Sequence, residues 1–102
     1  MNQEARDAHA EKVIASVVKK FLGRENIRKI VVNAIDDYSG EPSLYVNIHL
    51  KRADLLPSIE QRSELRDALR RELAGLEDSR FPYITMVGSY WEAEPTGERK
   101  SA

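Results

Sequence analysis

Side chains that could do chemistry occur in this 102-residue sequence, but their spacing does not assemble a reactive site. Asp36, Asp37 and Glu41 crowd one short turn and offer the oxygen ligands that hard cations prefer, yet the calcium-loop spacing is absent. Asp side chains also accept hydrogen bonds from nearby backbone N–H groups in turns, and we expect that role here. His9 and His49 lack the paired spacing of zinc ligands. The sequence therefore predicts no metal site and no cofactor.

The motifs of nucleophilic and nucleotide chemistry are missing as well. The segment 39–43 comes closest to a nucleophile elbow, but it lacks the Gly-x-Ser-x-Gly spacing. The five glycines are scattered singly, so no glycine-rich loop can cradle a phosphate, and there is no cysteine. We therefore expect a protein that binds a partner and is not an enzyme.

Basic side chains offer a candidate phosphate-binding surface. One helical turn separates each of Arg62, Arg66 and Arg70, so these residues are expected to form a ridge that could contact successive phosphates. Two further candidates for phosphate contact are Lys19 and Lys20 of the earlier helix. The alternative is that the arginine stems cover the rim of the core while their charged heads reach water.

The elements that must position these residues follow from the spacing of apolar side chains. Spacings of three and four predict two helices, whereas β-branched runs and strict alternation predict strands. The predicted elements are a helix over roughly 4–22, a strand over 27–36, a second strand over 44–51, a helix that begins after Ser58, and a last strand over 80–91.

Cap and turn residues mark where these elements begin and end. Gly23 and Gly75 predict the ends of the two helices, and Ser58 with Gln61 matches a capping box at the start of the second. The loop 37–43 is short and contains Gly40, so the two strands around it are predicted to form an antiparallel hairpin.

The order helix, strand, strand, helix, strand predicts a two-layer α+β sandwich, in which both helices cover one face of a three-stranded mixed sheet. A chain with 41% apolar residues and this length suits one domain, which we place at residues 1–92. Residues 93–102 contain no large apolar residue and are predicted to be a disordered tail.

The composition of the chain limits its possible binding partners and its cellular location. The net charge of −1 provides no long-range attraction to nucleic acid or to an anionic membrane, so any such contact must be local. There is no apolar run long enough to span a bilayer and no cysteine for a disulfide framework. We expect a cytoplasmic protein without a membrane contact.

The uncovered face of the predicted sheet is the preferred candidate site. Tyr45, Tyr83 and Trp91 are predicted to lie on it and to anchor a partner protein or a second copy of the chain. Arg80 is expected to bind a carboxylate of Asp36 or Asp37 at its rim. Unpaired RNA bases could also stack on the same aromatic rings.

Two resemblances bear on the function. The segments DYSGEPSLYV (residues 37–46) and RFPY (residues 80–83) resemble short uncharacterised bacterial proteins, which carry an acidic Asp-x-x-Gly turn before a strand and Arg-Phe-Pro-Tyr at the start of the last strand. The resemblance covers about residues 30–90. It implies the companion of a second small protein, as in toxin–antitoxin pairs.

The element order is also similar to the KH-like fold of ribosome-binding factor A, an RNA-contacting assembly factor. Residues 64–86 resemble its helix-to-last-strand region, although the Ala-x-Gly helix kink, a Gly-x-x-Gly loop and a basic excess are absent. This resemblance implies, as the alternative function, an RNA-binding or ribosome-associated module that uses the lysines and arginines named above.

Overall fold

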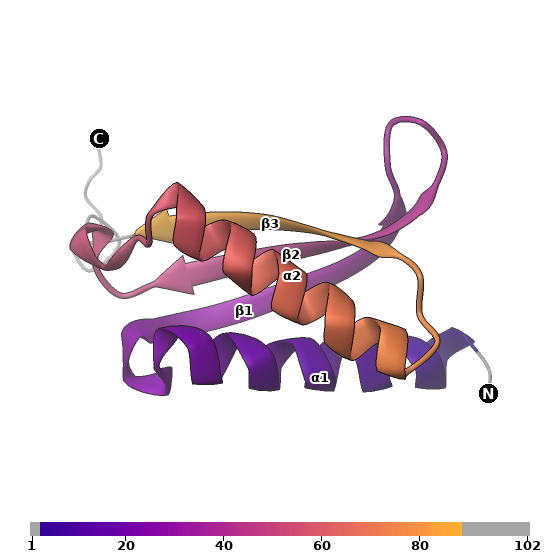
Figure 1. Ribbon diagram of the computed structural model, residues 1–102, viewed down its shortest axis with the longest axis horizontal. Coiled ribbons are helices and arrows are strands. Elements are labelled where there is room, and N and C mark those ends of the chain that lie inside the picture. The colour runs from indigo at the N-terminus through magenta and orange to yellow at the C-terminus, as the bar shows by residue number, and fades with distance from the viewer. Residues whose placement is uncertain (1–2, 89–102) are drawn as a thin grey trace, which may run out of the picture.

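Two helices pack on one face of a three-stranded sheet in the computed structural model, which describes residues 3–88 (Figure 1). In chain order, the elements are α1 (Gln3–Leu22), η1 (Arg24–Asn26), β1 (Ile27–Asp36), β2 (Pro42–Leu50), η2 (Ala53–Leu55), α2 (Ile59–Gly75) and β3 (Phe81–Gly88). The predicted αββαβ order and α+β class are confirmed. The predicted tail at residues 93–102 and Trp91 lie outside the described residues.

The sheet is mixed, and β2 is its central strand. β1 and β2 form the predicted antiparallel hairpin, whereas β3 runs parallel to β2 after the connection through α2. The register aligns Val46 of β2 with Val32 of β1 and Ile84 of β3. Aligned residues share one face of a sheet, so these three side chains form one row beneath the helices.

The core lies between this face and the two helices. Side chains at spacings of three and four from each helix meet alternate side chains of β2. The buried apolar residues are Ala10, Ile14 and Val18 from α1, Leu65, Leu69 and Leu73 from α2, and Leu44, Val46, Ile48 and Leu50 from β2. Strict alternation along β2 then places Tyr45, Asn47 and His49 on the opposite face, which neither α1 nor α2 covers.

Local chemistry at the helix ends matches the sequence. Gly23 adopts a φ of 93°, which favours glycine, and its N–H donates to the Lys19 carbonyl at 2.9 Å to end α1. At the start of α2 the Gln61 N–H donates to Ser58 Oγ at 3.1 Å, and the Ser58 N–H donates to Gln61 Oε1 at 2.9 Å. The predicted capping box is therefore confirmed. Within residues 3–88, neither helix is long and apolar enough to cross a membrane.

Candidate functional site

Aromatic rings gather on the uncovered face of the sheet, at the end where β2 and β3 begin. The register aligns Tyr45 with Tyr83, and their rings stack with centroids 5.1 Å apart and planes inclined by 21°. Phe81, two residues earlier on β3, contacts Tyr83 with centroids 4.8 Å apart. The predicted partner-binding residues Tyr45 and Tyr83 therefore lie together, in a continuous aromatic row.

The hairpin turn holds this row in place. The Tyr83 hydroxyl donates to Asp37 Oδ2 at 3.0 Å, which joins β3 to the β1–β2 turn across the central strand. The other Asp37 oxygen accepts from the backbone N–H groups of Ser39 and Glu41 and from the Ser39 hydroxyl. The aromatic row and the turn are thus one hydrogen-bonded unit.

These hydrogen bonds keep Asp37 ionised. The Glu41 N–H, with the Ser39 and Tyr83 hydroxyls, lowers the pKa of the Asp37 carboxyl to about 2. The same carboxylate raises the pKa of the Tyr83 hydroxyl above its ordinary value, since it accepts that proton as a hydrogen bond. The turn therefore carries a fixed negative charge beside the aromatic rings.

Exposed apolar side chains extend the row onto the turn. Ile35, at the end of β1, is 56% exposed, and Tyr38, at the tip of the turn, is 98% exposed. The turn is the loop that projects beyond the sheet in Figure 1. We call Ile35, Tyr38, Tyr45, Phe81 and Tyr83 the hairpin patch. The acidic residues Asp36, Asp37 and Glu41 border it.

Sequence reasoning missed three members of the hairpin patch, Ile35, Tyr38 and Phe81. Ile35 lies in the strand phase opposite to Val32, so period two could have placed it on the uncovered face. Phe81 shares that phase with Tyr83. Nothing in the local sequence signals the exposure of Tyr38, because exposure at a turn depends on whether another element packs there.

Arg80 does not bind Asp36 or Asp37, and this corrects the expectation from the sequence. Its guanidinium makes a two-pronged contact with Asp78, from Nε to Oδ1 at 2.9 Å and from Nη2 to Oδ2 at 2.6 Å. Nη1 donates to Asp7 Oδ1 of α1 at 2.6 Å. Asp78 is favoured over Asp36 and Asp37 as the partner of Arg80 because it lies only two positions away in the chain. The contact therefore requires no long loop to close.

The Arg80 side chain is 5% exposed and that of Asp78 is 1% exposed, so this ion pair is internal. The hydrogen bonds from Arg80 lower the pKa of the Asp78 carboxyl, and Asp78 in turn raises the pKa of Arg80. The residues join α1 to the start of β3. Arg80 therefore supports the fold at the start of β3.

The predicted phosphate-binding residues separate into two surroundings. Lys19 and Lys20 lie on the outer side of α1, in grooves lined by residues of α1, η1 and β1. Arg70 instead lies 5.4 Å above the Phe81 ring, and Arg66 donates to Ser63 at 3.5 Å. Arg66 and Arg70 thus contact α2 and the start of β3, whereas Arg62 is exposed on α2.

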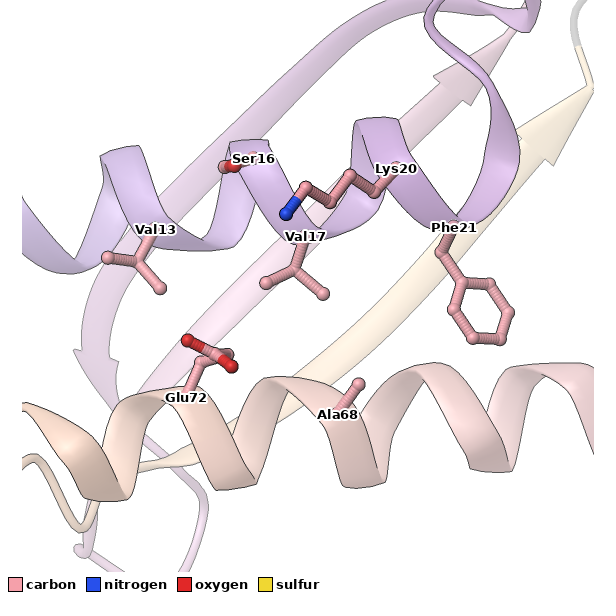
Figure 2. Close-up of a pocket in the computed structure, with 7 residues that line it drawn as sticks. All are labelled: Val13, Ser16, Val17, Lys20, Phe21, Ala68 and Glu72. Atoms are coloured by element: carbon pink, nitrogen blue, oxygen red, sulfur yellow. The ribbon is translucent and has the colours of Figure 1, made fainter.

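A groove of about 360 Å³ runs between the helices. Figure 2 shows Val13, Val17 and Phe21 pointing from α1 toward α2, while Ala68 and Glu72 point back from α2. Lys20 and Glu72 place one charge of each sign along this groove. Its apolar floor continues the core contact between the helices.

The described part of the chain contains no metal-binding cluster. Residues 3–88 contain no group of three or more His, Asp or Glu side chains that could hold a metal ion. The oxygens of Asp37 already accept hydrogen bonds from the turn and from Tyr83. His49 lies at the far end of the uncovered face, aligned with Lys29 and Val87. Its Nδ1 is covered and has no hydrogen-bond partner among the described residues.

Comparison with known proteins found no match to this chain among protein-family models, curated proteins or solved structures.

Proposed function

We propose that this protein is a non-enzymatic interaction module that binds a partner protein through the hairpin patch. One observation carries the proposal: the stacked Tyr45–Tyr83 pair lies on the sheet face that neither α1 nor α2 covers, and the exposed Ile35 and Tyr38 lie at the same end of the sheet. Large aromatic side chains are enriched among the residues that contribute most to protein interfaces. In this proposal the protein acts in the cytoplasm as the companion of a second small protein.

The hydrogen bonds of the patch favour binding. Tyr83 is fixed by Asp37 and by the ring of Tyr45 before any partner arrives. A side chain that is already ordered loses less conformational entropy when an interface forms. Tyr83 in the hairpin patch is therefore preorganised for binding.

The charge beside the patch limits the choice of partner. Asp36, Asp37 and Glu41 create a negative border that repels phosphates and favours a neutral or basic protein surface. Two copies that met through this patch would bring the same acidic turns together. These charges support a different protein as the partner, in preference to RNA or a second copy at this surface.

The test compares two exposed isoleucines. We expect the tagged protein, captured from the cells that make it, to retain one stoichiometric protein after nuclease treatment. Ile35→Asn should lose that protein, whereas Ile59→Asn should keep it, because Ile59 is 79% exposed on α2 and outside the patch. Tyr45→Ala should weaken the purified complex by about thirtyfold, which corresponds to ~2 kcal/mol for an interface anchor.

Three outcomes would contradict the proposal. The captured chain could retain no stoichiometric protein, the complex could survive Ile35→Asn and Tyr45→Ala unchanged, or both isoleucine variants could lose it equally. Circular dichroism of each variant identifies a loss that comes from unfolding.

A second candidate function, binding of nucleic acid, is favoured by a different surface. It is the surface around the exposed side of α1, at the end of the sheet away from the hairpin turn.

A further inference from the structure

Two adjoining grooves flank the exposed side of α1 where the chain turns into β1. Six basic residues line them, and the other lining residues are Ala15, Ser16, Ile27 and Ile30. Among residues 3–88, no acidic residue lines either groove. We define the basic surface as Lys12, Lys19, Lys20, Arg24, Arg28 and Lys29.

The tertiary structure creates this surface from three elements, α1, η1 and β1. Lys12, Lys19 and Lys20 come from α1, and the turn at Gly23 brings Arg24 and Lys29 to the same corner. Within residues 3–88, no carboxylate lies within ion-pair distance of these five side chains. All five residues are exposed, so their charges face solvent.

Ordinary helix chemistry explains part of this charge. Lysines in the last turn of a helix interact favourably with its dipole, which accounts for Lys19 and Lys20. It does not account for Lys12, two turns earlier, or for Lys29 in the strand. Lys12, Lys19, Lys20, Arg24 and Lys29 repel one another at this corner, and an anionic ligand would relieve that repulsion.

The spacing suits an extended anion. From Lys12 to Arg24 the surface runs for about 18 Å, at ~1.5 Å per helical residue. One strand of a duplex carries a phosphate every ~3.4 Å along the axis, so this length covers about five phosphates. A single small anion would leave most of these cations unused.

The lining favours a duplex over a single strand. Single-stranded nucleic acid is usually held by aromatic rings that stack on the bases. Within the described part of the chain, no aromatic residue lines either groove, and the helix presents a row of long cationic side chains. Such side chains reach phosphates without reading base edges.

The acidic turn lies too far away to cancel this field. Lys29 and Asp36 are at opposite ends of β1, separated by about 23 Å at ~3.3 Å per residue. That separation is nearly three times the Debye length of ~8 Å at physiological salt. We propose that the basic surface binds the phosphate backbone of a nucleic-acid duplex, without sequence preference.

The first test is fluorescence anisotropy of a labelled 20-base-pair duplex titrated with the full chain, from about 50 to 200 mM KCl. Five phosphate contacts at ~0.9 counterions each give a log–log salt slope of about −4 to −5. Two unrelated duplex sequences should bind equally, and a single strand of the same length should bind more weakly. Duplex RNA and duplex DNA are titrated separately to show which helix form is preferred.

The decisive variants each reverse two charges, one pair within the basic surface and one pair on α2. Lys19→Glu with Arg24→Glu should weaken duplex binding at least tenfold at 50 mM KCl and reduce the salt slope by about two. The matched control, Arg62→Glu with Arg71→Glu, makes the same change in net charge on exposed positions of α2 and should alter affinity less than threefold. If the first variant is unfolded, Lys19→Gln with Lys20→Gln is used, with an expected loss of at least fivefold.

Several results would overturn the proposal. They are an absence of duplex binding by the wild-type chain at 50 mM KCl, equal losses in the two charge-reversal variants, or tighter binding to the single strand. Binding to vesicles containing phosphatidylserine without binding to duplex would assign the surface to a membrane instead. Ile35→Asn should leave duplex binding unchanged, so failure here is distinguishable from failure of the proposed partner-protein function.

Discussion

At the scale of single residues, the most informative side chain is Asp37. One carboxylate accepts hydrogen bonds from two backbone N–H groups and from the hydroxyls of Ser39 and Tyr83. Tyr83 lies 46 positions later in the chain, so the same side chain closes the turn and fixes β3. A residue that fits ordinary turn chemistry in the sequence therefore also organises the proposed binding surface.

Asp37 should give the stability of the protein a specific dependence on pH. Its pKa is about 2 when folded and 3.8 in the unfolded chain, so ionisation stabilises the fold above about pH 4. This contribution is lost as the pH falls toward 2. The wild-type protein should thus be more stable than Asp37→Asn at pH 7, and the difference should shrink between pH 4 and pH 2.

Urea unfolding of both proteins at several pH values measures this difference. Asp78 titrates in both proteins and cancels in the comparison. Tyr83→Phe removes the hydrogen bond from the Tyr83 hydroxyl to Asp37. It should therefore lower the free energy of unfolding by a smaller amount than Asp37→Asn, with the same dependence on pH. Parallel stability curves for wild type and Asp37→Asn would contradict the role assigned to this carboxylate.

At the scale of elements, the helices and strands are specified by short-range chemistry. The α2 helix starts at the residue that its capping box marks, and it buries one leucine stripe. The β1–β2 hairpin closes through Gly40, whose φ of 85° suits glycine. Each of these features depends on residues within four positions of one another, which explains why the sequence predicts them.

Ser58 provides a test at this scale. Ser58→Ala removes the oxygen that accepts from the Gln61 N–H and should lower the free energy of unfolding by ~1 kcal/mol. Ser58→Gly should cost only a few tenths of a kcal/mol, because glycine tolerates the cap position. Thermal and urea unfolding measure both values. Equal stability of the Ala variant and the wild type would show that the helix does not depend on this cap.

At the scale of the whole molecule, charge is separated along the sheet. The hairpin end carries Asp36, Asp37 and Glu41, and the opposite end carries the basic surface. The net charge of −1 hides this separation. The two proposed binding surfaces therefore occupy opposite ends of one sheet, so a partner protein and a duplex could bind at the same time.

The buried ion pair between Arg80 and Asp78 connects distant parts of the molecule, because Arg80 also binds Asp7 of α1. Asp78→Ala would leave a buried guanidinium short of its partner and should lower the free energy of unfolding by roughly 3 kcal/mol. Breaking the exposed Arg52–Asp54 pair with Arg52→Ala should leave stability unchanged within error. Denaturant unfolding compares them, and equal effects would contradict a structural role for Arg80.

The sequence by itself determined the α+β class, the element order, the caps and the phase of the core residues. Val46, Ile48, Ile84 and Met86 lie on the helix side, where alternation placed them. Tyr45 and Tyr83 were also predicted to share the uncovered face, because period two fixes which side of a strand each residue occupies.

Only the tertiary structure decided which distant side chains meet. Arg80 binds Asp7, 73 positions away, and Tyr83 binds Asp37. The basic surface joins a helix to a strand. Periodicity and capping are local and can be read from neighbouring residues, whereas these contacts depend on the register of three strands and the placement of α1, which only packing of the whole core establishes.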